Sequence, residues 1–316
     1  MDPRSYGCWP TGHKTLQHTT RIERIMTEPA RDDRPRAAVV TVSYGSEGVL
    51  PEFLSGLADD IAAGVDVVVA DNAPSPDSPV ARIVGAAGAR YLPLDANHGY
   101  GGAINRAVAT LPVEIGWVLI SNPDVVLTPG VVDTLIRTGS EAPDIGSVGP
   151  AVLTAEGEVY PSARDVPSIR SGVGHALFAN LWPENPWTRR YKRSTESGDR
   201  RDAGWLSGSC VLVRRSAFEA IGGFDEDFFM YFEDVDLGYR LGLAGYRNVY
   251  QPAVSVVHSG AHSTRTNQGA MVAAHHESAR RFLHKKYRGW MLAPVRVTLG
   301  VGLAARSWLA QRKADS

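Results

Sequence analysis

Short apolar runs alternate with less apolar segments along the first half of the chain. Four such runs predict strands, at residues 37–44, 65–70, 91–94 and 117–121. The segments between them predict helices, at residues 50–63, 80–87 and 101–110. The first run is continuous and rich in β-branched residues, which is typical of a strand buried in a parallel sheet. The alternation therefore predicts an α/β fold with a mostly parallel central sheet flanked by helices.

The second half of the chain is less regular. Residues 154–203 contain four prolines and predict a loop-rich connection. Beyond it, strands are predicted at residues 205–213 and 249–258, and helices at residues 216–221, 233–244 and 271–287. Residues 1–36 show neither the helical nor the strand period, so we interpret them as a disordered extension. Met26 within this extension is an alternative start of translation.

Composition narrows the class of protein. Apolar residues make up 43% of the chain and charged residues 21%, the balance of a packed globular protein. The formal net charge of −1 gives no reason to expect a nucleic-acid partner. Two cysteines exclude a disulfide framework and fit a reducing cytoplasm. No stretch of eighteen apolar residues lacks a charge, so no membrane-spanning helix is predicted.

The C-terminal end has a charge pattern of its own. Nine Lys or Arg and no Asp or Glu lie between Arg280 and Lys313, and Trp290 and Trp308 stand among them. Basic residues beside Trp and aliphatic residues predict a helix that binds at the surface of an anionic membrane. The alternative interpretation is a solvated basic tail.

Polar residues follow the predicted strands at their carboxyl ends, where parallel sheets bind ligands. Asp71 follows the second strand, and Asn122-Pro123-Asp124 follows the fourth. The Asp124 carboxylate is placed to hold a hard divalent cation against a diphosphate, although Asn-Pro-Asp also suits a plain turn. His258 ends the last strand, and it is either a ligand of the same site or a structural histidine.

Three carboxylates, Glu233, Asp234 and Asp236, follow a run of large apolar and aromatic residues. Apolar surroundings raise the pKa of a carboxyl group and suit it to act as a general base. The alternative is that the acids form the negative first turn of a helix, where its dipole favours them.

Residues 97–105 (NHGYGGAIN) contain three glycines before a helix. Glycines allow a backbone to approach a ligand closely, but they also allow a tight packing turn. Their spacing is not that of a dinucleotide fingerprint, and the motif does not follow the first strand. Both facts argue against a Rossmann dehydrogenase.

Taken in order, these motifs resemble those of the family-2 glycosyltransferases of GT-A fold. The resemblance covers residues 37 to about 285 and rests on five segments, at residues 67–72, 97–105, 121–124, 204–215 and 222–246. Four shorter segments, VYPSAR, NPWT, AHST and AAHH at residues 159–164, 185–188, 261–264 and 273–276, are similar to the actinobacterial rhamnosyltransferases of the cell-wall arabinogalactan linker. Those enzymes transfer L-rhamnose from dTDP-L-rhamnose to N-acetylglucosaminyl-diphospho-polyprenol with inversion, and the resemblance implies that reaction here.

The resemblance also implies roles for single residues. Asp234 is the implied catalytic base, and Asp124 and His258 are the implied ligands of Mn²⁺ or Mg²⁺. The implied nucleotide-binding residues are Ser43, Asp71, Asn97, Gly101 and Asn122. The implied acceptor-binding residues are Arg164, Trp205, Leu206, Ser207, Gly208 and Glu233. Asn122 stands where the family's aspartate motif begins with an acid, so a single carboxylate carries more of the metal binding.

The expected organisation follows from this assignment. A catalytic domain is expected at residues 37–268, with a nucleotide-sugar half at 37–150 and an acceptor half at 151–268. A helical membrane-surface segment is expected at 269–316, which places the protein peripherally at the cytoplasmic face of the plasma membrane. A homodimer is left open.

Other activities stay open at this stage. UDP-galactofuranose and GDP-mannose are alternative donors, because Asp71 pairs with uracil or thymine alike. A catalytically silent nucleotide-sugar-binding protein is a further alternative, against which Asp124, Asp234 and His258 together argue.

Overall fold

A computed structural model describes residues 36–75, 78–168, 198–260, 268–289 and 293–294. Residues 1–35, the NPWT and AHST motifs and most of the basic tail lie outside the described residues. The described ranges all belong to one compact unit, which begins at Pro35.

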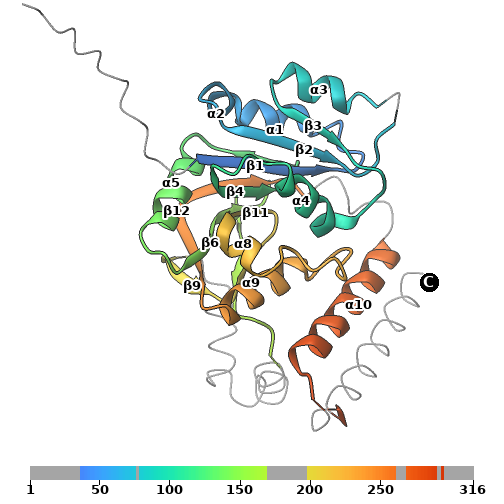
Figure 1. Cartoon of the computed structure of the whole chain (residues 1–316), viewed down its shortest axis with the longest axis vertical. Coiled ribbons are helices and arrows are strands. Elements are labelled where there is room, and N and C mark those ends of the chain that lie inside the picture. The colour runs from blue at the N-terminus through green and yellow to red at the C-terminus, as the bar shows by residue number, and fades with distance from the viewer. Residues whose placement is uncertain (1–35, 76–77, 169–197, 261–267, 290–292, 295–316) are drawn as a thin grey trace, which may run out of the picture. The chain divides into compact units, whose positions relative to one another are not determined.

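The first four strands form the predicted parallel sheet (Figure 1). They are β1 (Arg36–Ser43), β2 (Asp66–Asp71), β3 (Arg90–Pro93) and β4 (Ile115–Ser121). Their order is β3-β2-β1-β4, and each neighbouring pair is parallel. Ser43 pairs with Asp71 at the carboxyl ends of β1 and β2. This register brings polar residues together at the carboxyl ends of the strands, as the sequence predicts.

The sheet becomes mixed beyond β4. It continues through β11 (Cys210–Arg214), β6 (Ile145–Leu153), β12 (Arg247–His258) and β5 (Val125–Leu127). Strand β11 runs antiparallel to both of its neighbours, whereas β12 runs parallel to β6. The short strands β7 (Val159–Tyr160) and β9 (Arg201–Ala203) pair with β6 and β12. A separate ribbon joins β8 (Ala163–Arg164) to β10 (Trp205–Leu206).

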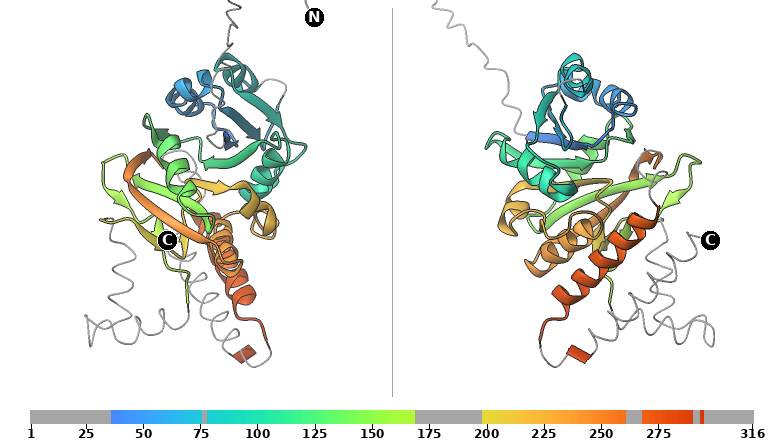
Figure 2. Two further views of the ribbon diagram at one scale, coloured as in Figure 1. Left: turned by 60° about the vertical axis from the view of Figure 1, so that its left-hand side comes forward. Right: turned by 90° about the vertical axis from the view of Figure 1, so that its right-hand side faces the viewer.

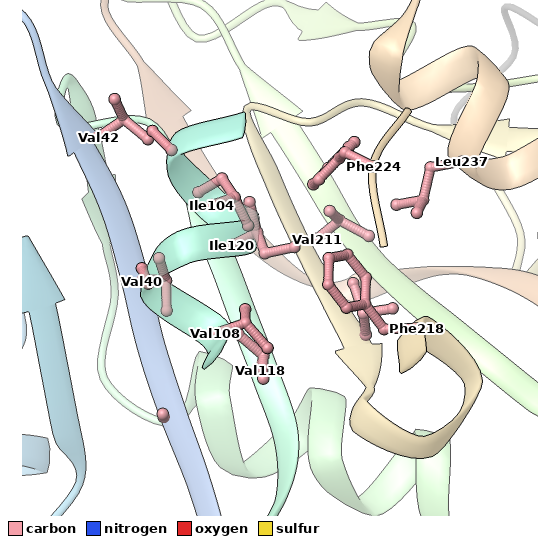
Figure 3. Close-up of a cluster of buried hydrophobic side chains, with 14 of the residues drawn as sticks. Val40, Val42, Ile104, Val108, Val118, Ile120, Val211, Phe218, Phe224 and Leu237 are labelled. Carbon is pink, nitrogen blue, oxygen red and sulfur yellow. The ribbon is translucent and has the colours of Figure 1, made fainter. Parts of the chain in front are cut away.

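Helices cover both faces of this sheet. Successive side chains of β1 point to opposite faces, so they belong alternately to two hydrophobic cores. One face packs against α1 (Leu50–Gly56), α3 (Val80–Ala86) and α5 (Val131–Ser140), with α2 (Ala58–Ala62) following α1. The predicted helix 50–63 is thus two helices separated at Leu57. The other face packs against α4 (Gly99–Ala109), α8 (Arg215–Ala220) and α9 (Glu233–Leu243). Figure 3 shows Ile104 and Val108 of α4 in the same core as strand valines and Phe218, Phe224 and Leu237.

The last described helix, α10 (Gln268–Lys286), packs on the region that carries the acids (Figure 2). Phe282 of α10 is fully buried in a small third core with Phe228 and Val235. None of the helices in the described part of the chain is long and apolar enough to cross a membrane.

Candidate active site

Helix α9 starts at the predicted acids, after an unusual turn. Tyr231 and Phe232 both adopt left-handed backbone conformations, with φ angles of 67° and 66°. They are the only non-glycine residues with positive φ in the described ranges. Such conformations cost of order 1–3 kcal/mol each and persist where surrounding contacts enforce them. The turn therefore places Glu233 and Asp234 at the cost of local strain.

Asp234 is held by two backbone N–H groups. Gly208 donates to its Oδ2 at 3.0 Å, and Val235 donates to its Oδ1 at 2.8 Å. Burial raises the pKa of Asp234, and these two hydrogen bonds and the charge of Arg164 oppose that rise. Each oxygen keeps further acceptor capacity. A buried, oriented carboxylate of raised pKa has the properties of a general base.

Glu233 lies beside Asp234 in a different environment. Burial, and then the charge of Asp234, raise the pKa of Glu233 to about 8. Its Oε2 is buried without a hydrogen-bond partner among the described residues. Glu233 is therefore protonated at neutral pH and can donate a hydrogen bond to a ligand hydroxyl.

The turn 207–209 joins the acids to the rest of the sheet. Besides binding Asp234, Gly208 accepts a hydrogen bond from the Tyr100 hydroxyl at 2.7 Å. Ser209 accepts one from the backbone N–H of Asn122 at 2.9 Å. Burial raises the pKa of Tyr100, and the charges of Glu233, Asp234 and Asp124 act in the same direction. Tyr100 thus lies within the electrostatic reach of both the acid pair and the predicted metal ligand.

The predicted metal ligands are brought together at the carboxyl end of β4. The Nε2 atom of His258 lies 3.1 Å from Oδ1 of Asp124, and the two side chains are 25% and 10% exposed. The same nitrogen lies 3.4 Å from Nδ2 of Asn122. Asn122 and Asp124 lie just before β5, and His258 is the last residue of β12. The pairing of β5 with β12 brings them together. Within the described residues, no three His, Cys, Asp or Glu side chains form a metal-binding group by themselves.

The predicted nucleotide residues Ser43 and Asp71 are both buried. Asp71 is 1% exposed, and its two oxygens accept hydrogen bonds from the backbone N–H of Ala73 and the Tyr91 hydroxyl. Burial and that hydrogen bond raise the pKa of Tyr91 to about 12. Ser43 is 0% exposed, so the structure gives its hydroxyl no open face for a nucleotide. The roles of Ser43 and Asp71 toward the nucleotide stay predictions.

Glycines of the NHGYGGAIN motif serve packing in this structure. A Cβ atom on Gly101 would lie 2.7 Å from Cβ of Phe224, and one on Gly99 would lie 2.3 Å from the carbonyl oxygen of Phe229. Phe224 and Phe229 therefore approach the backbone of these glycines closely. Asn97 is exposed, and its Oδ1 accepts from the N–H of Gly99 at the start of α4.

The predicted acceptor residues divide into two groups. Trp205 is partly exposed, and its register partner Arg164 acts electrostatically on Asp234. Ser207 is also partly exposed, and its hydroxyl lies 3.0 Å from that of Ser209. Leu206, in contrast, is buried in the main core. Its role toward the acceptor stays a prediction.

Three residues near the site were not singled out from the sequence. Tyr100 ties α4 to the 207–209 turn, as described above. Asn72 binds the α4 start, donating to the Gly99 carbonyl at 2.9 Å and accepting from the His98 N–H at 3.2 Å. Tyr44 follows β1 with its side chain 64% exposed, next to the strand end that carries the buried Ser43. Each belongs to a motif that the sequence displays, but only the fold distinguishes them from neighbouring polar residues.

Comparison with known proteins adds to this geometry. Residues 15–280 match the family described as "Glycosyltransferase like family 2". A Mycobacterium tuberculosis protein named N-acetylglucosaminyl-diphospho-decaprenol L-rhamnosyltransferase is 44% identical over 283 residues, which cover 87% of this chain and 92% of that protein. The Escherichia coli rhamnosyltransferase WbbL is 29% identical over 256 residues, which cover 78% of this chain and 92% of that protein.

A solved structure has a similar fold. The mannosyltransferase PcManGT from Pyrobaculum calidifontis, in complex with GDP-Man and Mn²⁺, gives a TM-score of 0.55 at 18% identity. The match covers 90% of this chain and 76% of that chain.

Proposed function

The chain belongs to the family-2 glycosyltransferases and has the GT-A fold, and from this premise we propose that it transfers L-rhamnose from dTDP-L-rhamnose to N-acetylglucosaminyl-diphospho-polyprenol with inversion. The name of the M. tuberculosis relative supports the sugar and the acceptor class. The observation that carries the proposed chemistry is the buried Asp234 carboxylate, which two backbone N–H groups orient.

The reaction is a single in-line displacement. Asp234 takes the proton from an acceptor hydroxyl while that oxygen forms a bond to the anomeric carbon of rhamnose. The bond from this carbon to the diphosphate oxygen breaks, and the nucleoside diphosphate leaves with the electron pair. The attack occurs from the side opposite the leaving group, so the anomeric configuration inverts.

In this scheme, Glu233, Trp205 and Arg164 position the acceptor. Protonated Glu233 donates a hydrogen bond to the acceptor sugar, and the Trp205 ring offers an apolar face to it. Arg164 lies opposite Trp205 and carries a positive charge suited to an acceptor phosphate.

A divalent cation fits the residues at the end of β4. The carboxylate of Asp124 and the imidazole of His258 are the oxygen and nitrogen ligands that Mn²⁺ accepts, and Mg²⁺ favours the carboxylate. Only two such side chains lie close together among the described residues, so a bound cation would need further ligands, which a diphosphate could supply. The cation, when bound, neutralises charge on the leaving diphosphate.

On the donor side, Asp71 is the residue proposed to recognise the base, and the exposed ring of Tyr44 offers a surface for stacking on it. Asn97 and Asn122 are the polar groups proposed to contact the rest of the nucleotide. Because the acceptor carries a lipid, the enzyme is proposed to work as a peripheral protein at the cytoplasmic face of the membrane.

The proposal is tested with purified protein, a panel of nucleotide sugars and a short-chain N-acetylglucosaminyl-diphospho-lipid. dTDP-L-rhamnose is expected to support transfer, and UDP-galactofuranose and GDP-mannose are expected not to. Preferred use of either other donor would replace the rhamnosyl assignment while keeping the fold and mechanism.

A further inference from the structure

Helix α10 contacts the strained turn that precedes the acids. Ser278 donates from its hydroxyl to the carbonyl oxygen of Met230 at 2.8 Å, and Met230 directly precedes the left-handed pair. The His275 ring lies edge-on to both rings of that pair, 5.6 Å from Tyr231 and 5.3 Å from Phe232 between centroids. One face of α10 thus holds the backbone and the side chains of this turn.

The same helix also holds the first turn of α9. The Nζ atom of Lys285 lies 2.6 Å from Oδ1 of Asp236 and 2.5 Å from Oδ2 of Asp225. Asp236 is fully buried, and its Oδ2 accepts a hydrogen bond from Arg240 at 2.6 Å. Between the two contacts, Phe282 of α10 is buried against Phe232. Glu233 and Asp234 therefore lie between two residues that α10 contacts, Met230 before them and Asp236 after them.

These contacts are separate from the cores that hold the sheet together. Among the described side chains of α10, Phe282 belongs to the small third core, and none belongs to the two cores on the faces of the sheet. Loss of a single α10 contact should therefore loosen the turn without opening the fold. Left-handed backbone at two bulky residues relaxes unless something holds it.

From this arrangement we propose that α10 is a positioning element of the transferase, in which Ser278 holds the Met230 carbonyl and so keeps the strained turn that aims Asp234 at the acceptor hydroxyl. The proposal rests on the proposed function, since it assigns Ser278 a role through Asp234.

The test compares Ser278→Ala with Arg280→Ala, measured with the short-chain acceptor. Arg280 is exposed on the same helix and pairs with Glu277, so its loss leaves the turn untouched. Ser278→Ala is expected to lower kcat roughly 10- to 100-fold, the effect of a small misplacement of a reacting group. The KM for the nucleotide sugar and the melting temperature are expected to stay near those of the control. An unchanged kcat would overturn the proposal.

A second substitution separates positioning from general support of the fold. Asn adopts left-handed backbone more readily than Tyr, so Tyr231→Asn reduces the need for an external hold. When Ser278→Ala is combined with Tyr231→Asn, it is expected to cost less kcat than it does in the wild-type background. Equal losses in both backgrounds would show that Ser278 supports the structure without positioning the turn.

Amide hydrogen exchange gives a readout that does not depend on activity. The N–H groups of Gly208 and Val235 donate to Asp234 and report its position. Both should exchange faster in Ser278→Ala than in Arg280→Ala, and equal rates would overturn the proposal. Faster exchange in a protein that transfers no rhamnose would support the positioning of Asp234 and refute the proposed function.

Discussion

Asp234 and Glu233 are adjacent acids that the fold places in different surroundings. Asp234 accepts two backbone hydrogen bonds, which favour its charged form. Glu233 has a buried oxygen without a partner among the described residues and a pKa of about 8. The sequence motif alone shows two equivalent carboxylates, whereas their different surroundings support the proposed roles of Asp234 in proton removal and of Glu233 in hydrogen-bond donation.

This difference predicts unequal effects of amide substitution. Asp234→Asn keeps the shape and loses the base, so kcat should fall by about 10²–10⁴ while nucleotide binding is retained. Glu233→Gln replaces a protonated acid by another donor and should reduce kcat much less at pH 7. Steady-state rates and calorimetric nucleotide titration of both variants check this. Near-normal turnover by Asp234→Asn would refute its role as the base.

The raised pKa of Glu233 also predicts how stability depends on pH. The folded protein holds this proton more tightly than the unfolded chain, so stability falls as pH rises between the ordinary value of 4.5 and about 8. Glu233→Gln cannot ionise and avoids this loss. Its free energy of unfolding relative to wild type should rise by at most about 1.4 kcal/mol per pH unit across the window and level off above it. Denaturant unfolding at several pH values measures it, and a difference independent of pH contradicts the assignment.

The metal proposal makes a separate prediction. Transfer should require a divalent cation, and Asp124→Ala should abolish the response to added Mn²⁺ because it removes the carboxylate of the pair with His258. Rates with chelator and with graded Mn²⁺ or Mg²⁺ provide the measurement. Full activity in excess chelator would remove the cation from the mechanism.

At the residue scale, candidate functional residues could be predicted where they follow the end of a strand or a long apolar run. Asp124 and His258 meet as expected, although they lie far apart in the chain, because both follow strands of one sheet edge. Ser43 and Leu206 could not be judged in the same way, because access depends on which face of a strand a side chain occupies. Burial of both follows from packing around β1 and β10 that no local pattern specifies.

Among the elements, the parallel half of the sheet was predictable because β1, β2 and β4 each consist mostly of consecutive apolar residues. Strand β6 was not predicted, since the glycines and proline of its sequence IGSVGPAVL are typical of a turn. The fold needs those small residues: a Cβ on Gly146 would lie 2.7 Å from Tyr246, and one on Gly149 would lie 3.1 Å from Leu206. The predicted strand 205–213 is likewise split, because Tyr100 and Asp234 bind the backbone of Gly208 between β10 and β11.

Packing of α4 gives a prediction at the element scale. Gly101→Ala places a methyl group against Cβ of Phe224, which cannot swing away, and should destabilise the protein by about 1–3 kcal/mol. Gly85→Ala in α3 is the matched control, because nothing lies within 4 Å of its added Cβ. That change should stabilise the protein by about 0.5–1 kcal/mol. Denaturant unfolding compares the two. Equal effects would show that α4 does not pack tightly on the 224–229 segment.

For the whole molecule, α10 changes how the basic C-terminal pattern is interpreted. Arg280 pairs with Glu277, Arg281 lies 3.6 Å from Asp227, and Lys285 binds two buried or partly buried acids. Lys286 donates to the carbonyl oxygen of Pro167, and burial lowers its pKa. Four of the nine basic residues therefore contact the protein itself. The proposed membrane binding therefore rests on the five basic residues that follow, most of which lie outside the described residues.

The last prediction concerns those residues. Deleting residues 289–316 leaves α10 whole and removes Arg296, Arg306, Arg312 and Lys313 together with Trp290 and Trp308. Each basic residue can gain about 1 kcal/mol near an anionic surface, and the Trp residues add insertion at the headgroup boundary. The truncated protein should therefore sediment less with anionic liposomes at low salt. It should transfer more slowly to a long-chain polyprenyl acceptor than to a short soluble one.

A charge-only variant separates the two contributions. Replacing Arg296, Arg306, Arg312 and Lys313 by Gln in the full-length protein keeps the apolar residues and removes the salt-dependent attraction. Its liposome binding should fall between those of the full-length and truncated proteins and should lose its dependence on salt. The residues proposed to bind the nucleotide lie far upstream, so KM for the nucleotide sugar should stay constant in all three proteins. If the three proteins sediment alike, or if truncation slows both acceptors equally, the segment after α10 has no role at the membrane and the proposed peripheral location loses its support.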